Sequence, residues 1–267
     1  MSSWSEVCPE DVRLSLDQIH PSWAEVIDAG LNAVHQANPD YLPGLKSSAY
    51  LPEQGRLFAA FSMPMDSVRY ILVGEGPYPR ADSATGYCFM DGAVKNLWSD
   101  EVGGGLSKKV NRATSLRNFM KMLLVAAGEL QSDATTGIAM AAVAEKARHP
   151  DSGFIQTLAA LQANMINRGF LLLNASLVFR TDTAPVKDAK AWQPFLEKML
   201  AMLLQRRKHE NFPAPALVLW GKIAEQLRQM PVVSSYPQVS AEHPYNLSFI
   251  ANQTMQDFFR PMNLLAK

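Results

Sequence analysis

The sequence predicts an α/β fold, a single three-layer α/β/α domain built on a central four-stranded, mostly parallel sheet. Four short apolar runs have the length of buried strands, and segments with the apolar spacing of helices lie between them. Strands and helices that alternate in this way form a parallel sheet with helices on both faces. The 267 residues, of which 48% are hydrophobic, suffice to bury one large core or two small ones, and one domain spanning residues 1–267 is the simpler arrangement.

Each expected strand is an apolar run that ends in a polar or glycine-containing segment. The four runs cover residues 69–73, 170–173, 216–220 and 231–235, the last being the least apolar. Helical spacing is found over residues 23–36, 116–130, 154–168, 192–208 and 222–230. Residues 38–54 predict a loop, because they contain three prolines and a glycine. Residues 131–152, with an alanine-rich helix at about 138–147, predict a surface insertion.

Composition and charge exclude several classes of protein. The 25 basic and 25 acidic residues balance, which argues against a broad cationic surface. Cys8 and Cys88 are too few for a disulfide framework, a zinc site or an iron–sulfur cluster, and indicate reduced thiols. The acidic N-terminal stretch is unlike a signal peptide, and no apolar run reaches the ~18 residues of a membrane helix. We therefore expect a cytoplasmic protein without metal or membrane contact. We also expect a monomer that uses no cofactor.

The segments that follow the expected strands hold the residues of chemical interest, because ligands of open parallel sheets bind beyond the carboxyl ends of the strands. Residues 74–80, GEGPYPR, predict a tight turn whose glycines allow close backbone approach to a ligand. Asn174 ends the second strand, where its amide can donate and accept hydrogen bonds at once. Trp220-Gly221 ends the third strand, and residues 242–248, EHPYNLS, follow the fourth.

These four segments resemble motifs of the uracil-DNA glycosylase superfamily. In order they read GEGPYP, GFLLLN, LVLWG and HPYNLS, and the family-1 enzymes have GQDPYH, GVLLLN, LLWG and HPSPLS. The resemblance covers most of the chain and includes residues 50–52, 58–61 and 114–118, the last (TSLRN) being similar to the serine-containing DNA loop of the family. A single motif of this kind indicates little, whereas four in the same order indicate the superfamily.

The resemblance implies an enzyme that flips uracil out of DNA and hydrolyses its N-glycosidic bond. It implies that Asn174 pairs with the Watson–Crick edge of the base, that Phe89 stacks on it, and that Tyr78 excludes the methyl group of thymine. Gly76 belongs to the same base-binding turn. His243 would act in catalysis by donating a hydrogen bond to the uracil oxygen that gains negative charge.

The resemblance also implies contacts with the rest of the DNA. Leu247 would wedge into the base stack that the flipped nucleotide leaves. Ser115 and Ser248 would hold phosphates, and Arg117 would bind DNA beside them. Lys108, Lys109 and Arg112 extend this region into a short basic strip suited to phosphates, although an ordinary solvated face would have the same composition.

The sequence departs from the family-1 pattern at a residue that matters for catalysis. Gly76 stands where those enzymes have the Asp that positions water. Pro79 replaces a His, and Tyr245-Asn246 replaces Ser-Pro. Other branches of the superfamily also lack this Asp, and a missing general base slows a reaction without abolishing charge stabilisation on the leaving base. Our hypothesis is that Glu75, or alternatively Asp82, supplies the carboxylate that positions water.

Three functions stay open from the sequence. The first is a DNA-repair glycosylase that removes uracil or another deaminated base. The second is a DNA-binding relative that keeps the fold and the base pocket with weak or no activity. The third is a protein-interaction module. Residues 103–109, GGGLSKK, do not indicate a nucleotide-triphosphate site, because the GxxxxGK[ST] spacing and a preceding strand are both missing.

Overall fold

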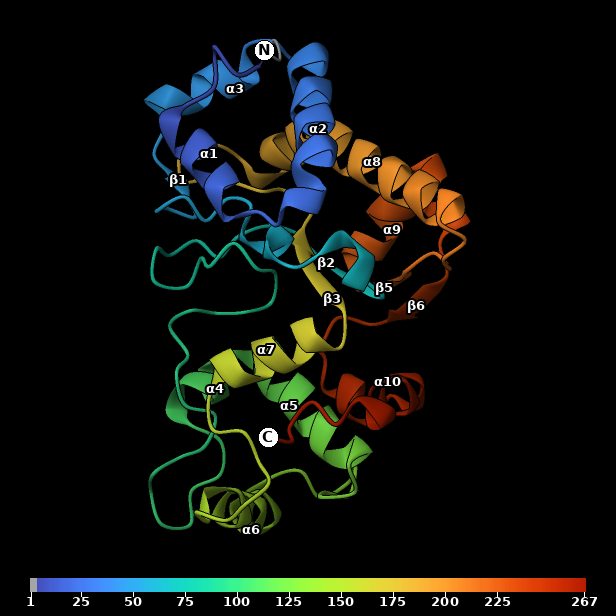
Figure 1. Ribbon diagram of the computed structural model, residues 1–267. Coiled ribbons are helices and arrows are strands. Elements are labelled where there is room, and N and C mark those ends of the chain that lie inside the picture. The colour runs from blue at the N-terminus through green and yellow to red at the C-terminus, as the bar shows by residue number, and fades with distance from the viewer. Residues whose placement is uncertain (1–3) are drawn as a thin grey trace. The chain divides into compact units, whose positions relative to one another are not determined.

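The computed structural model describes residues 4–267 and contains a four-stranded sheet; residues 1–3 of the expected domain lie outside the described residues. The strand order is β3-β2-β5-β6 (Figure 1). β2 (Tyr70–Gly74) pairs in parallel with β3 (Phe170–Asn174) and with β5 (Ala216–Trp220). The predicted α/β class is confirmed, and three of the four expected strands are present.

The fourth expected strand is wrong. Residues 231–235 form the 3₁₀ helix η6 (Pro231–Ser235), and the edge strand β6 (Gln238–Ala241) follows it. Pro231 has a fixed φ and no N–H, which suits the first position of a helical turn. The Ser234 hydroxyl donates to the Pro231 carbonyl oxygen at 2.7 Å and closes that turn. Val233 is the buried residue of this segment, so the apolar run is too short to span a sheet.

The described chain forms two compact units. Unit 1 comprises residues 4–92, 169–219 and 223–239, and unit 2 comprises residues 93–168, 220–222 and 240–267. The expectation of a single domain stays a prediction.

Unit 1 contains β2, β3 and most of β5. The long helix α8 (Pro185–His209) packs against α2 (Ala24–Ala37), as Figure 1 shows. α8 begins seven residues before the expected 192, because Pro185 occupies its first turn. The other helices are α1 (Glu10–Leu14), α3 (Tyr41–Gly44), α9 (Lys222–Arg228), η1 (Ser15–Gln18), η2 (Pro21–Trp23), η3 (Leu45–Ser47), η4 (Ala59–Ser62) and η5 (Met65–Ser67).

Residues 38–54 are more ordered than the expected loop. They contain α3 and the short strand β1 (Tyr50–Leu51), which pairs antiparallel with β4 (Phe179–Arg180). A buried carboxylate joins these parts: Asp188 accepts a hydrogen bond from the Tyr41 hydroxyl at 2.8 Å and forms an ion pair with Arg180 at 2.7 Å. Tyr41 and Asp188 are 147 residues apart in sequence, so no local pattern indicates their hydrogen bond.

Unit 2 is built around an aromatic cluster. Trp220 at the end of β5 contacts Phe119, Phe249 and Phe259, and their ring centroids lie 5.4–6.2 Å from the Trp220 centroid. The helices of this unit are α4 (Lys108–Arg112), α5 (Thr114–Ala126), α6 (Gly137–Arg148), α7 (Leu158–Asn167), α10 (Gln253–Phe259), η7 (Leu247–Ala251) and η8 (Arg260–Met262). α7 begins four residues after the expected 154, because the Thr157 hydroxyl caps it by accepting from the Ala160 N–H at 3.1 Å.

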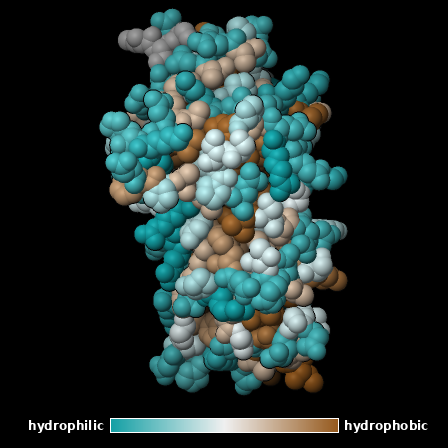
Figure 2. All heavy atoms as spheres, turned by 90° about the vertical axis from the view of Figure 1, so that its right-hand side faces the viewer, coloured by the Kyte–Doolittle hydropathy of each residue, from teal (hydrophilic) through white to brown (hydrophobic). Residues whose placement is uncertain are grey.

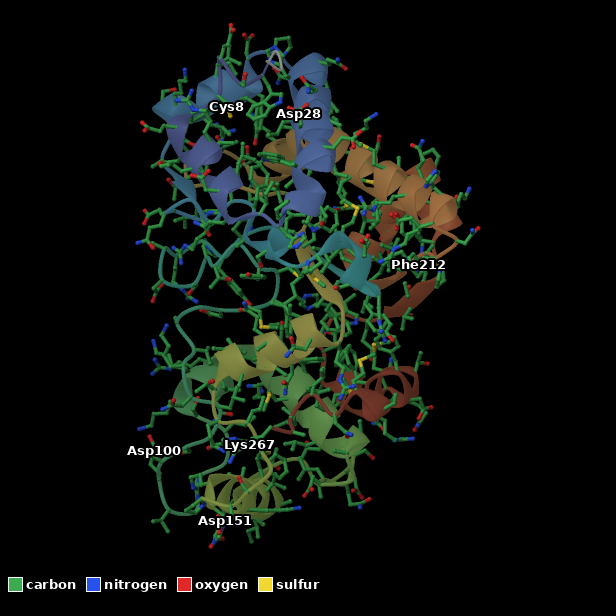
Figure 3. The ribbon with its side chains drawn as sticks, in the orientation of Figure 1. Cys8, Asp28, Asp100, Asp151, Phe212 and Lys267 are labelled. Atoms are coloured by element: carbon green, nitrogen blue, oxygen red, sulfur yellow. The ribbon has the colours of Figure 1, made fainter. Side chains whose placement is uncertain are left out.

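None of the described helices combines the length and apolarity that a membrane span requires. Apolar and polar residues are interspersed on the face drawn in Figure 2. Cys8, in the N-terminal part of unit 1 (Figure 3), and Cys88 are both buried and unbridged. Burial raises the pKa of the Cys8 thiol to about 12, so it stays protonated at neutral pH.

Candidate functional site

The carboxyl ends of β2 and β3 meet in a tight corner of unit 1. Gly74 and Asn174 are partners in the parallel register, and the N–H groups of Ala175 and Ser176 donate to the carbonyl oxygens of Gly74 and Glu75 at 2.8 and 3.0 Å. A Cβ added to Gly74 would lie 2.9 Å from the Asn174 Oδ1. It would lie equally close to the Cβ of Cys88. The corner therefore requires glycine at this position.

The Asn174 side chain is buried but makes no hydrogen bond with any residue that the structure describes. It is 4% exposed, and its amide atoms still reach solvent. Buried polar groups are almost always paired, so an amide in this state offers one donor and one acceptor to a ligand. The sequence predicted this residue as one that binds the base, and the structure places it, buried, at the carboxyl end of β3.

Glu75 and Gly76 lie in the exposed turn after β2. A Cβ added to Gly76 would meet nothing closer than Ser176 Cβ at 3.6 Å, so sterics do not require glycine here. The Glu75 carboxylate is exposed and has no partner within residues 4–267. Asp82, the alternative carboxylate, is also exposed and accepts a long hydrogen bond from the Ser83 hydroxyl at 3.5 Å.

Tyr78 and Phe89 come together in the same unit. The Tyr78 hydroxyl donates to the Phe89 carbonyl oxygen at 3.5 Å, and both side chains are half-buried. Burial raises the pKa of the Tyr78 hydroxyl, so it remains neutral. Phe89 has a φ of 65°, in the left-handed region that non-glycine residues seldom adopt and that recurs at functional sites. Arg80 closes this loop through an ion pair with Asp91 at 3.2 Å.

The loop that begins at His243 belongs to unit 2. The Tyr245 N–H donates to His243 Nδ1 at 3.1 Å, so this nitrogen is an acceptor and the proton of the neutral ring lies on Nε2. Gly221, with a φ of +71°, packs against the same residue, since an added Cβ would lie 2.7 Å from His243 Cβ. The Cβ of His243 is thus packed tightly against the Gly221 backbone.

Asn118 holds this loop, a role that the sequence reading missed. Asn118 lies in α5 with no exposed surface, and its Nδ2 donates to the carbonyl oxygens of Pro244, Tyr245 and Asn246 at 2.8, 3.2 and 3.4 Å. The sequence does contain a signal for it, an asparagine within a mostly apolar helix. A buried amide needs hydrogen-bond partners, so such a residue indicates a contact with another segment.

The residues predicted to contact DNA are either exposed or already used in hydrogen bonds within the protein. Leu247 is 69% exposed, while Phe249 and Ile250 that follow it are buried and anchor η7. Ser248 is exposed in η7, and Ser115 is half-exposed in the first turn of α5. Arg117 is used partly within the protein. Its Nε donates to the Asn118 Oδ1 at 3.3 Å and its Nη1 to the Asn111 carbonyl oxygen at 3.0 Å.

No family model matches the chain, but individual proteins do. The crystal structure of wild-type UNG from Nitratifractor salsuginis is similar, with a TM-score of 0.83 and 36% identity over 97% of this chain and 96% of that one. The uracil-DNA glycosylase of Azotobacter vinelandii is 26% identical over 243 residues, which is 88% of this chain and 85% of the relative. That of Thermobifida fusca is 28% identical over 229 residues, 85% of this chain and 79% of the relative.

The likeness to the solved UNG structure defines the fold: this chain has the same three-layer α/β/α fold. The chain belongs to the uracil-DNA glycosylase superfamily.

Proposed function

We propose that this protein is a DNA-repair glycosylase that hydrolyses the N-glycosidic bond of uracil in DNA. The buried amide of Asn174, which makes no hydrogen bond among the described residues, is the observation that carries the proposal. Uracil presents an N3–H donor beside an O4 acceptor, which Asn174 Oδ1 and Nδ2 complement. Hypoxanthine and xanthine present the same donor and acceptor pair, so the space around Asn174 decides among deaminated bases.

Bond breaking places negative charge on the leaving base. The C1′–N1 bond cleaves, its electron pair goes to the uracil ring, and the charge spreads to O2. The Nε2–H of His243, fixed as a donor by the Tyr245 N–H on Nδ1, would stabilise that oxygen. Removing one such donor from an enzyme costs about 10²–10³-fold in rate.

Water completes the reaction. Its oxygen adds to C1′ of the sugar, and its proton passes to a carboxylate. Glu75 is our candidate for that carboxylate, because it follows β2 directly and its side chain is unpaired among the described residues. Gly76 has no side chain to contribute.

The remaining predicted residues would select and expose the base. Phe89 would stack on uracil, and the neutral phenol of Tyr78 would occupy the space of the thymine methyl group. Leu247 would fill the gap in the base stack, since its exposure suits a wedge that offsets the few kcal/mol of unstacking. Ser115 and Ser248 would hold phosphates. In this proposal the protein works as a cytoplasmic monomer without metal or cofactor.

The second candidate is a DNA-binding relative with little or no activity. The specific observation in its favour is Gly76, because the turn has room for a side chain and yet holds none. Both candidates bind DNA, so excision of the base distinguishes them.

The test measures release of uracil, hypoxanthine and xanthine from single-stranded and duplex oligonucleotides, with thymine as the control base. We expect the wild-type protein to release uracil and Glu75→Gln to slow it by about 10²–10⁴-fold, the usual contribution of a general base. The matched control Asp82→Asn removes the other carboxylate and should leave the rate unchanged. Equal rates for wild type and Glu75→Gln would remove Glu75 from the mechanism. DNA binding without release of any base would establish the second candidate.

A further inference from the structure

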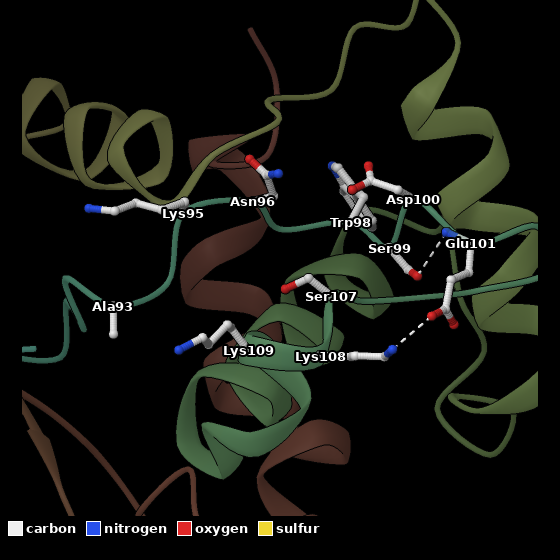
Figure 4. Close-up of a pocket in the computed structure, with 10 residues that line it drawn as sticks. All are labelled: Ala93, Lys95, Asn96, Trp98, Ser99, Asp100, Glu101, Ser107, Lys108 and Lys109. Carbon is white, nitrogen blue, oxygen red and sulfur yellow. Dashed lines mark hydrogen bonds and ion pairs between the residues drawn. The ribbon is translucent and has the colours of Figure 1, made fainter.

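We propose that a groove in unit 2 binds the phosphodiester backbone of the DNA strand that Ser115 would contact, an inference that rests on the proposed function. The groove has a volume of about 410 Å³, and its lining includes Lys95, Asn96, Ser107 and Lys109 (Figure 4). None of these residues has a role in the reaction described above.

The charge of the groove is uneven. Lys95 and Lys109 extend on the same side of it (Figure 4), and their ammonium groups have no partner within the described part of the chain. Lys108 is neutralised by Glu101, whose Oε1 lies 2.8 Å from its Nζ. This carboxylate raises the pKa of Lys108 by hydrogen bonding and charge attraction. Asp100 lies beside Glu101, away from the two unpaired lysines (Figure 4). One end of the groove is therefore cationic, although the whole chain has no net charge.

Neutral donors complete the cationic end. The Ser107 hydroxyl oxygen accepts from the Val110 N–H at 3.2 Å as the cap of α4, which leaves its own hydrogen to donate outward. The Asn96 side chain is exposed beside it. A phosphodiester offers only acceptor oxygens and one negative charge, which this set of donors matches.

The backbone around the groove is fixed before any ligand binds. The Leu97 N–H donates to the Gln156 carbonyl oxygen at 2.9 Å, and the Lys95 carbonyl oxygen accepts from the Leu158 N–H at 2.9 Å. The buried Trp98 indole donates to the Ile155 carbonyl oxygen at 2.8 Å. Binding here would require only the lysine side chains to become ordered, which keeps its entropic cost small.

The groove is also continuous in sequence with a proposed DNA contact. α4, which carries Lys109, ends at Arg112, and α5 begins at Thr114 with Ser115 next. Phosphates repeat every 3.4 Å of helix axis along one strand, so a strand held at Ser115 presents further phosphates to a neighbouring cationic groove.

The test is a binding titration with the double variant Lys95→Ala/Lys109→Ala on duplex DNA that contains no uracil. Each phosphate contact adds about 0.9 to the slope of log affinity against log salt, so the slope should fall by about 1.8. The affinity difference from wild type should then shrink by about 10-fold between 50 and 200 mM salt. The matched control is Lys187→Ala/Lys190→Ala, which removes two exposed lysines of α8 that line no part of the groove.

Unchanged affinity and slope in the groove variant would overturn the proposal and would identify an ordinary solvated face. An equal loss in the control variant would overturn it too, because the effect would then reflect net charge alone. The DNA contains no damaged base, so this result is independent of excision. A protein that fails to release uracil but shows the groove effect would refute the proposed reaction and leave the phosphate groove in place.

Discussion

Two buried asparagines, one in each unit, use the same side chain in opposite ways. Asn174 ends β3 at 4% exposure with its amide unpaired among the described residues. Asn118 lies in α5 with no exposed surface, and its amide donates to three successive carbonyl oxygens of the His243 loop. An amide that makes no hydrogen bond among the described residues and an amide used by the fold look identical in sequence, so only their partners tell the two apart.

The surroundings of Asn174 and Asn118 also differ. Around Asn174 the backbone approaches closely at Gly74 and leaves no room for adjustment. Around Asn118 the held loop displays large apolar groups, with Tyr245 67% and Leu247 69% exposed. A fixed backbone beneath exposed side chains suits a loop that inserts into a partner, whereas a rigid corner suits selection of one base.

The largest effect is expected from Asn174→Ala. Without both hydrogen bonds to the base edge, uracil release should fall by about 10⁴-fold, as is usual for sites built to bond a substrate group. The free energy of unfolding should change little, because the substitution removes a polar group that makes no hydrogen bond among the described residues. Single-turnover excision and thermal unfolding measure the two effects. Retained excision would show that Asn174 does not read the base.

Asn118→Ala should reverse this pattern. Three carbonyl oxygens lose their donor, so we expect a loss of about 1–3 kcal/mol in the free energy of unfolding and a smaller, ~10-fold, loss of excision through the displaced His243 loop. A double-mutant cycle with His243→Ala separates positioning from general destabilisation. If Asn118 acts through His243, its substitution should cost far less excision once His243 is absent. Additive losses would leave Asn118 with a purely structural role.

The sequence anticipated the parts of this molecule whose signals are local. β2, β3 and β5 are continuous apolar runs because they are buried on both faces. β6 reads QVSA and lies at the sheet edge, where partial exposure removes the apolar signal. The Asn118 contacts span 126 to 128 residues, and the groove lysines Lys95 and Lys109 come from separate segments. Such partners become neighbours only through the fold.

The smallest effect on stability is expected from Gly76→Asp, and it is best compared with a substitution at Gly74, the last residue of β2. A Cβ at Gly76 would lie 3.6 Å from Ser176 Cβ and 3.7 Å from its carbonyl oxygen, which are ordinary contacts, and Gly76 does not adopt a positive φ. The free energy of unfolding should therefore change by less than ~0.5 kcal/mol. Gly74→Ala should instead cost about 1–3 kcal/mol, because its new Cβ would meet Asn174 and Cys88 at 2.9 Å.

The same substitution tests where the water-positioning carboxylate belongs. In a Glu75→Gln background, we expect Gly76→Asp to raise the excision rate at least ~10-fold above that of Glu75→Gln alone. The reason is that a carboxylate at the position used by family-1 enzymes can take over the task assigned to Glu75. With Glu75 intact, the gain should be smaller, since a carboxylate is already present. The measurement is the excision rate and the thermal unfolding of four proteins: wild type, Glu75→Gln, Gly76→Asp and the double variant. A Gly76→Asp protein as unstable as Gly74→Ala would mean that the turn after β2 needs both glycines, and the room at Gly76 would then have no catalytic significance.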